Sequence, residues 1–147
     1  AGCIFTRGNF VNEVPYDPKY YFYGEEQSMA LRAFTRGFSF FHIPEVPLFH
    51  LYTDVDNPTR KLHWDPEDDK NRATKWHELD KISLERLDNL FAYKLEGVFG
   101  LGNQRSLMDY AGISGIDLQN RKILDLEKAT ESSFIESLDW KINPLGT

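Results

Sequence analysis

The sequence predicts an α/β fold, and three neighbouring segments give the reasons. Residues 25–36 predict a helix of about three turns, because Met29 and Ala33 recur at helical spacing and Gly37 follows as a typical helix stop. The aromatic segment after this glycine predicts a buried strand. In residues 48–52, alternate side chains would fall on one face, as they do in a β-strand. A helix followed by two strands is a typical α/β arrangement.

The start of the predicted helix carries two adjacent carboxylates. Gly24 can take the positive φ or the close approach that precedes a helix, and Glu25 and Glu26 then lie in the first turn, where the helix dipole favours negative charge. Successive helical residues point about 100° apart, so one carboxylate can face a cleft while the other bonds backbone N–H groups or a basic side chain. Alternatively, both glutamates only complement the dipole.

The two predicted strands place a histidine near these acids. Residues 38–43 read as a mostly buried strand that Pro44 stops. On the second strand, Leu48, His50 and Tyr52 share one face. The carboxylates and His50 are therefore expected at the same end of a sheet. An imidazole in such a position is otherwise a hydrogen-bonded core residue.

The flanking segments complete the expected order. Residues 3–6 predict a short buried strand, residues 10–14 an extended piece, and residues 53–72 a long surface loop. An amphipathic stripe predicts a helix from Trp76 to a stop at Gly97.

Two further helices are expected near the C-terminus. One begins near Ser106, which forms a capping box with Asp109, and a last one covers residues 124–138.

Composition limits the partners and the organisation. The 147 residues suffice for one domain with a real core. The net charge of −6 makes nucleic acid and anionic membranes poor partners, since like charges repel. Cys3 is the only cysteine, so no intrachain disulfide forms, which is compatible with a reducing compartment. No apolar run approaches the roughly 20 residues of a membrane span.

Two strings, GEEQSMALRAFTRGFSFFHIPEVPLFHLY and LGNQRSLMDYAGISGID, resemble a known enzyme family. They are similar to the glycosyltransferases that add N-acetylglucosamine (GlcNAc) to hydroxyproline of a cytoplasmic protein, distant relatives of the polypeptide GalNAc transferases. The residues that carry the first resemblance are Gly24, Glu25, Glu26, Arg32, Thr35, Gly37, Pro44, His50 and Tyr52. The family's nucleotide-binding half, with its metal-binding D-x-D motif, is expected upstream of Ala1.

The resemblance implies the C-terminal part of a GT-A-like nucleotide-sugar transferase fold. Residues 1–75 would belong to the catalytic domain, and residues 76–147 would form a helical appendage packed on it. The intact cytoplasmic enzyme would transfer GlcNAc from a UDP-sugar to a hydroxyl acceptor on a protein, with retention of configuration and help from Mn²⁺ or Mg²⁺. The chain alone is expected to show little transfer.

The resemblance also assigns roles to single residues. Glu25 and Glu26 are the expected catalytic residues, and His50 is the expected metal ligand. The expected substrate-binding residues are Gly24, Arg32, Tyr52, Trp64 and Arg105.

For several of these residues the sequence leaves other roles open. Arg32 can instead pair with Glu25 or with loop aspartates, and Trp64 can anchor a loop to the core. Arg105 precedes a helix, where a phosphate can bind. The alternative function is a non-catalytic module that holds a glycan or a protein with the aromatics of residues 20–23 and 63–64.

Overall fold

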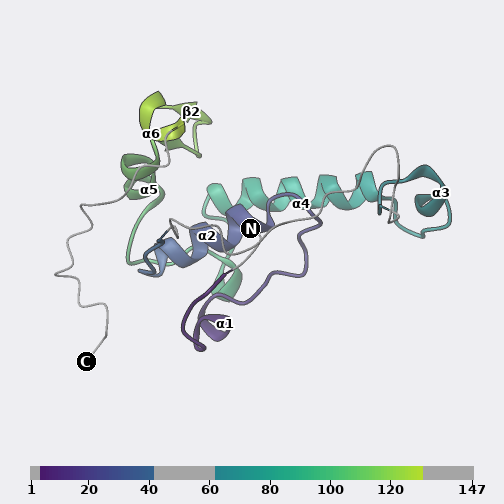
Figure 1. Cartoon of the computed structure of the whole chain (residues 1–147), viewed down its shortest axis with the longest axis horizontal. Helices are drawn as coiled ribbons and strands as arrows, with labels where there is room; N and C mark the ends of the chain where they lie inside the picture. Colours follow the sequence, from purple (N-terminus) through teal and green to yellow (C-terminus); the bar gives the residue numbers. More distant parts are fainter. Residues whose placement is uncertain (1–3, 42–61, 131–147) are drawn as a thin grey trace.

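The computed structural model describes residues 4–41 and 62–130, and it is mainly helical (Figure 1). The longest helix forms the axis of the molecule, and the other elements lie along one side of it and at its two ends. In chain order the elements are α1 (Phe10–Glu13), α2 (Glu25–Thr35), α3 (Pro66–Asp69), α4 (Trp76–Phe91), the 3₁₀ turn η1 (Gly97–Phe99), α5 (Leu107–Ser114), β1 (Ile116–Asp117), β2 (Lys122–Ile123) and α6 (Leu126–Thr130).

Helix α2 confirms the prediction for residues 25–36 and its two glycine boundaries. Gly24 has φ 84° and Gly37 has φ 90°, both in the left-handed region. A Cβ on Gly24 would also lie 3.2 Å from the ring of Tyr20 and 3.4 Å from Leu87 of α4. Glycine is therefore needed at position 24 for its backbone conformation and for its close contacts.

Two small buried clusters hold the helices together. Phe10, Val14 and Ala33 join α1 to α2. Tyr20 packs with Leu87 and Leu90 of α4. The segment between α1 and α2 therefore contributes to both clusters, with Val14 in the first and Tyr20 in the second.

The predictions for the N-terminal segments were wrong. Residues 4–6 form no strand and are exposed, with Phe5 96% accessible. Residues 10–14 are not extended either, since they contain α1. The reason is packing: Phe10 and Val14, one helical turn apart, are both buried, and Phe10 meets the ring of Phe38 edge-on at 5.2 Å.

The predicted aromatic strand is also wrong where the structure describes it. Residues 38–41 have no regular structure, and Phe40 and Phe41 are 40% and 64% exposed. Within the described ranges the strands are instead β1 and β2, an antiparallel hairpin in which Ile116 faces Ile123. The alternating segment 48–52 lies outside the described residues.

Helix α4 ends earlier than predicted, at Phe91 and not at Gly97. Tyr93 takes the left-handed conformation after it, with φ 57°. The Tyr93 N–H donates to Leu90 at 3.1 Å, and the Lys94 N–H donates to Asn89 at 2.8 Å. This pair of bonds is the Schellman motif, which normally uses glycine at the position that Tyr93 occupies.

Elsewhere the later predictions were partly right. Ser106 caps α5, because its side chain accepts from the Asp109 N–H at 3.1 Å while Asp109 accepts from the Ser106 N–H at 2.7 Å. The bonds from Ser106 lower the pKa of the Asp109 carboxyl. The predicted loop 53–72 contains α3 in its described part. The last predicted helix, 124–138, is described only as α6 and its surroundings up to residue 130.

The described part of the chain combines helices with one small sheet, which is consistent with the α/β class. Among the described helices, none has the length and apolarity that crossing a bilayer requires.

Candidate functional site

The two predicted catalytic acids occupy the first turn of α2 and have different surroundings. Glu25 is half-buried and accepts a hydrogen bond from the hydroxyl of Tyr16. Glu26, the next residue, is exposed. The adjacent carboxylates therefore point different ways, as helical geometry requires. Glu25 is oriented by a protein partner, and Glu26 lies at the surface.

Tyr16 is the partner that the sequence did not reveal. The hydrogen bond to Glu25 and partial burial raise the pKa of the Tyr16 hydroxyl to about 12. A neutral hydroxyl beside a carboxylate donates its proton to the bond and fixes the direction of the acid. The raised pKa keeps the Tyr16 hydroxyl protonated at ordinary pH values, so it can donate to Glu25.

The segment that leads into these acids makes a tight turn around Phe22. The Tyr23 N–H donates to the Tyr21 carbonyl at 2.6 Å, and Phe22 between them has φ 53°. Ser83 of α4 holds both sides of the turn: its hydroxyl accepts from the Tyr21 N–H at 3.1 Å and donates to the Tyr23 carbonyl at 2.6 Å. Ser83 is fully buried, so α4 determines how the chain enters α2.

An aromatic surface lies at this turn, and we define it as Tyr21, Phe22, Tyr23, His63 and Trp64. The rings of Phe22 and Trp64 meet at 5.1 Å with an angle of 65°. Phe22 and Tyr23 are about 60% exposed, and Trp64 is 37% exposed. Trp64 thus contacts neighbouring rings and keeps part of its own ring open to solvent.

The opposite end of α2 is bound to the glycine-bearing loop 97–105, in an arrangement that we call the arginine clasp. Arg32 is 1% exposed, and its guanidinium donates to the carbonyls of Pro15 at 2.8 Å and Val98 at 3.2 Å. It also lies over the ring of Phe99, 5.9 Å from the ring centre. Burial lowers the pKa of this guanidinium, which still remains charged.

Arg36 and Thr35 complete the clasp. Arg36 donates to the carbonyl of Gly100 at 2.9 Å and to that of Gly97 at 3.1 Å. Thr35 accepts the Gly102 N–H at its hydroxyl, 2.7 Å away, and the Gln104 N–H at its carbonyl, 2.9 Å away. The end of α2 thus donates hydrogen bonds to the loop through Arg36 and accepts them through Thr35. The two strings of the family resemblance therefore form one structural unit.

The clasp changes the interpretation of two predicted substrate-binding arginines. Arg32 faces the interior and pairs with backbone carbonyls, whereas the sequence had suggested Glu25 or loop aspartates as its partners. Arg105 donates to the carbonyl of Phe38 at 2.8 Å and lies 5.0 Å from the centre of the Phe34 ring. Both residues have structural partners in this chain.

A buried ion pair stiffens the neighbouring region. Arg86 of α4 donates to Asp17 at 2.6 Å, and Asp17 is 2% exposed. The Arg86 guanidinium also lies 5.8 Å from the centre of the Phe99 ring, so this ring contacts the cations of Arg86 and Arg32. The pair ties the segment before the aromatic surface to α4.

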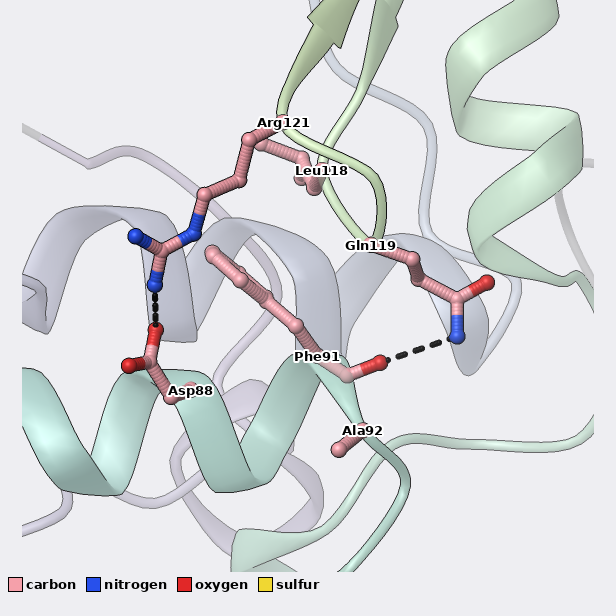
Figure 2. Close-up of a pocket in the computed structure, with 6 residues that line it drawn as sticks. All are labelled: Asp88, Phe91, Ala92, Leu118, Gln119 and Arg121. Carbon is pink, nitrogen blue, oxygen red and sulfur yellow. Dashed lines mark hydrogen bonds and ion pairs between the residues drawn. The ribbon is translucent and has the colours of Figure 1, made fainter.

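A separate hollow lies between α4 and the β1–β2 hairpin (Figure 2). Arg121 crosses it to an ion pair with Asp88 at 2.6 Å, and Gln119 donates to the Phe91 carbonyl at 3.0 Å. The lining residues are Asp88, Phe91, Ala92, Leu118, Gln119 and Arg121. None of them is a predicted site residue.

Two predicted site residues lie outside the described part of the chain. They are His50, the expected metal ligand, and Tyr52. Their convergence with the acids of α2 stays a prediction. Among the described residues there is no group of three histidine, cysteine, aspartate or glutamate side chains that could hold a metal ion.

Sequence reasoning missed Tyr16 and Ser83, and it included Phe22 only among the aromatics of residues 20–23 in the alternative function. An aromatic run before the helix was a visible signal for Phe22. Ser83 gave no signal, because a serine inside an amphipathic helix looks like any polar surface residue, and its partners are backbone groups 60 and 62 positions away.

Comparison with known proteins gives one match. Residues 1–120 match the family model described as Glycosyltransferase (GlcNAc). No curated protein and no solved structure matches the chain. The matched range includes the acids of α2, the aromatic surface and the arginine clasp, and family membership implies a role in glycosyl transfer with a sugar donor and an acceptor. The chain therefore belongs to the glycosyltransferase (GlcNAc) family.

Proposed function

We propose that this protein transfers GlcNAc from a UDP-sugar to a hydroxyl acceptor on a protein, and that hydroxyproline is that acceptor. The observation that carries the proposal is the pair of carboxylates at the start of α2, inside the range that matches the family. Glu26 is exposed at the surface, and Glu25 is held by Tyr16. A GT-A-type fold and a cytoplasmic location belong to the same proposal.

The proposed reaction retains the configuration of the sugar. The bond between the anomeric carbon and the diphosphate oxygen breaks, and the acceptor oxygen bonds to the same face of that carbon. The acceptor proton passes to an oxygen of the departing UDP. Retention needs no base on the opposite face of the sugar ring, so the carboxylates act by holding the sugar and the acceptor in the orientation that the reaction requires.

Metal assistance by Mn²⁺ or Mg²⁺ is part of the proposal, with His50 as the ligand from this chain. Such ions bind about six ligands, mostly oxygens. The described residues by themselves do not fit such a site, so His50 would need further ligands from elsewhere. When bound, the ion would neutralise charge on the leaving diphosphate.

A transfer assay with the full-length protein tests the proposal. The protein is incubated with UDP-GlcNAc and a hydroxyproline-containing peptide, with a proline-containing peptide as the matched control. We expect UDP release and a gain of one GlcNAc on the hydroxyproline peptide alone, with the α-anomer seen by NMR. A β-linked product would contradict retention. Equal UDP release with both peptides would contradict the proposal that hydroxyproline is the acceptor.

The aromatic surface favours one other function, a module that binds glycans without transferring sugar. Exposed rings bind sugars whether or not chemistry follows. Sugar binding by the full-length protein with no UDP release from any UDP-sugar would support the module and reject the transferase.

A further inference from the structure

Phe22 has a backbone conformation that does not suit its side chain. Its φ of 53° lies in the left-handed region, which bulky residues rarely adopt because Cβ crowds the next carbonyl. Glycine or asparagine would fit the position with less strain. Something other than local backbone preference therefore favours phenylalanine here.

Two other non-glycine residues of the described ranges have positive φ, and each has a visible reason. Tyr93 ends α4, and its hydroxyl accepts from the Leu107 N–H at 3.0 Å. Arg121 lies in the β1–β2 turn and pairs with Asp88. In both cases the side chain makes a polar bond to another element of the fold.

Phe22 gains little from the fold by comparison. The residue is 58% exposed, and within the described ranges its ring meets those of Tyr23 and Trp64, each at 5.1 Å and each partly exposed. Burial of such a ring contributes little to folding, since most of its surface remains in water. Strained residues that the surrounding structure holds in place are concentrated at functional sites.

The surrounding structure does hold Phe22 in place. Ser83 is fully buried in α4 and bonds the backbone on both sides of Phe22, at Tyr21 and Tyr23. The chain thus uses a buried hydroxyl to present an exposed ring. The acids Glu25 and Glu26 follow three and four residues later, at the start of the same helix.

We propose that Phe22, together with Trp64, binds the pyranose ring of a GlcNAc unit, and that Ser83 is the positioning residue for Phe22. Aromatic faces pack against the apolar C–H face of a sugar, as they do against other apolar rings. Nearby carboxylates accept hydrogen bonds from sugar hydroxyls. The inference rests on the proposed function only for the class of sugar, which follows from the family.

Saturation-transfer NMR on the full-length protein tests the inference with two probes, methyl β-N-acetylglucosaminide and UDP-GlcNAc. We expect Phe22→Gly to weaken binding of at least one probe roughly tenfold, while the thermal midpoint stays equal or rises because backbone strain is relieved. Phe22→Tyr keeps the ring and should bind as the wild type does. Phe22→Asn, which tolerates the left-handed conformation, should repeat the result for Phe22→Gly.

Tyr93→Gly is the matched control, because it also removes an exposed aromatic from a left-handed position. It should leave sugar binding unchanged. Ser83→Ala should weaken binding in the wild type and add no further loss in the Phe22→Gly background, since a positioning residue acts through the ring that it positions. An equal loss in both backgrounds would show that Ser83 is only structural.

The two probes identify the source of the bound sugar. Loss with both probes indicates the ring of GlcNAc itself, loss with UDP-GlcNAc alone indicates the donor, and loss with the glycoside alone indicates an acceptor glycan. Binding of both probes by Phe22→Gly as tightly as by the wild type would overturn the inference, as would no saturation transfer to either probe in the wild type. Phe22-dependent binding without transfer would reject the proposed function and leave this inference standing.

Discussion

The two ends of helix α2 are built in opposite ways. At its C-terminal end, Arg32, Thr35 and Arg36 bind loop 97–105 through buried or half-buried hydrogen bonds. At its N-terminal end, a strained turn at Phe22 leads to exposed rings and to Glu26 at the surface. One end therefore makes the helix rigid, and the other presents exposed rings and an exposed carboxylate at the surface.

The comparison explains how the site can carry strain. Local strain persists only where the rest of the structure determines the conformation. Here the arginine clasp fixes one end of α2, and Ser83 and the Asp17–Arg86 ion pair fix the approach to the other. We therefore expect substitutions in the clasp to change stability and substitutions at the N-terminal end to change activity.

The strongest way to break the clasp is Arg32→Met. This change removes the arginine bond to the Pro15 carbonyl, leaves the Val98 carbonyl with its bond from Arg36 alone, and removes a cation from Phe99. We therefore expect a loss of about 3 kcal/mol in the free energy of unfolding. Urea denaturation measures it. Arg121→Met is the control, because its ion pair with Asp88 is exposed and should be worth less than about 1 kcal/mol. Equal losses of stability for the two variants would show that Arg32 contributes no more to stability than an exposed ion pair does.

A second test separates the loop from the helix. In Gly102→Ala the new Cβ would lie 2.5 Å from the Thr35 carbonyl oxygen, so the loop must move away from α2. We expect a loss of about 2 kcal/mol. Gly112→Ala is the matched control, since nothing lies within 4 Å of its Cβ and it is in helix α5. That change should stabilise the protein by about 0.5–1 kcal/mol.

A smaller effect is expected for Tyr16→Phe at the other end. The folded protein holds the Tyr16 proton up to about pH 12, against an ordinary pKa of 10.0. The Tyr16 hydroxyl therefore contributes stability below pH 10 that is lost as the pH rises to 12. Half of Tyr16 is exposed, so the loss should be modest.

Chemical denaturation at pH 9 and pH 11 measures the effect. The gap in stability between wild type and Tyr16→Phe should shrink at the higher pH. A gap that stays constant would contradict the hydrogen bond to Glu25. Other groups titrate in this range in both proteins, and the difference between the two removes their contribution.

How much of this the sequence predicts depends on whether an interaction has a side-chain pattern. Helix α2, its two glycine boundaries and the Ser106 cap follow from local chemistry, and the sequence predicts them correctly. The helix α1 was missed because its support, the contact of Phe10 with Phe38, joins distant residues. The strand over residues 38–41 was wrong because Phe38 packs on the cluster of α1 and α2 outside any ladder, while Phe40 and Phe41 are exposed.

The candidate site shows the same division. The acids and the family resemblance are visible in the sequence, whereas the partners of Arg32, Arg36 and Ser83 are backbone groups, which every residue has. No residue pattern marks such partners. The positions of His50 and Tyr52 relative to the acids stay predictions, since both residues lie outside the described ranges.

The most direct test of the central claim, that the exposed end of α2 acts on the sugar, is the turnover rate of Glu26→Gln in the full-length protein. Because a positioning carboxylate is lost, we expect kcat for GlcNAc transfer to fall about a hundredfold. The thermal midpoint should stay within a few degrees of the wild type, since Glu26 is a surface residue. Wild-type turnover by a folded Glu26→Gln variant would contradict the central claim.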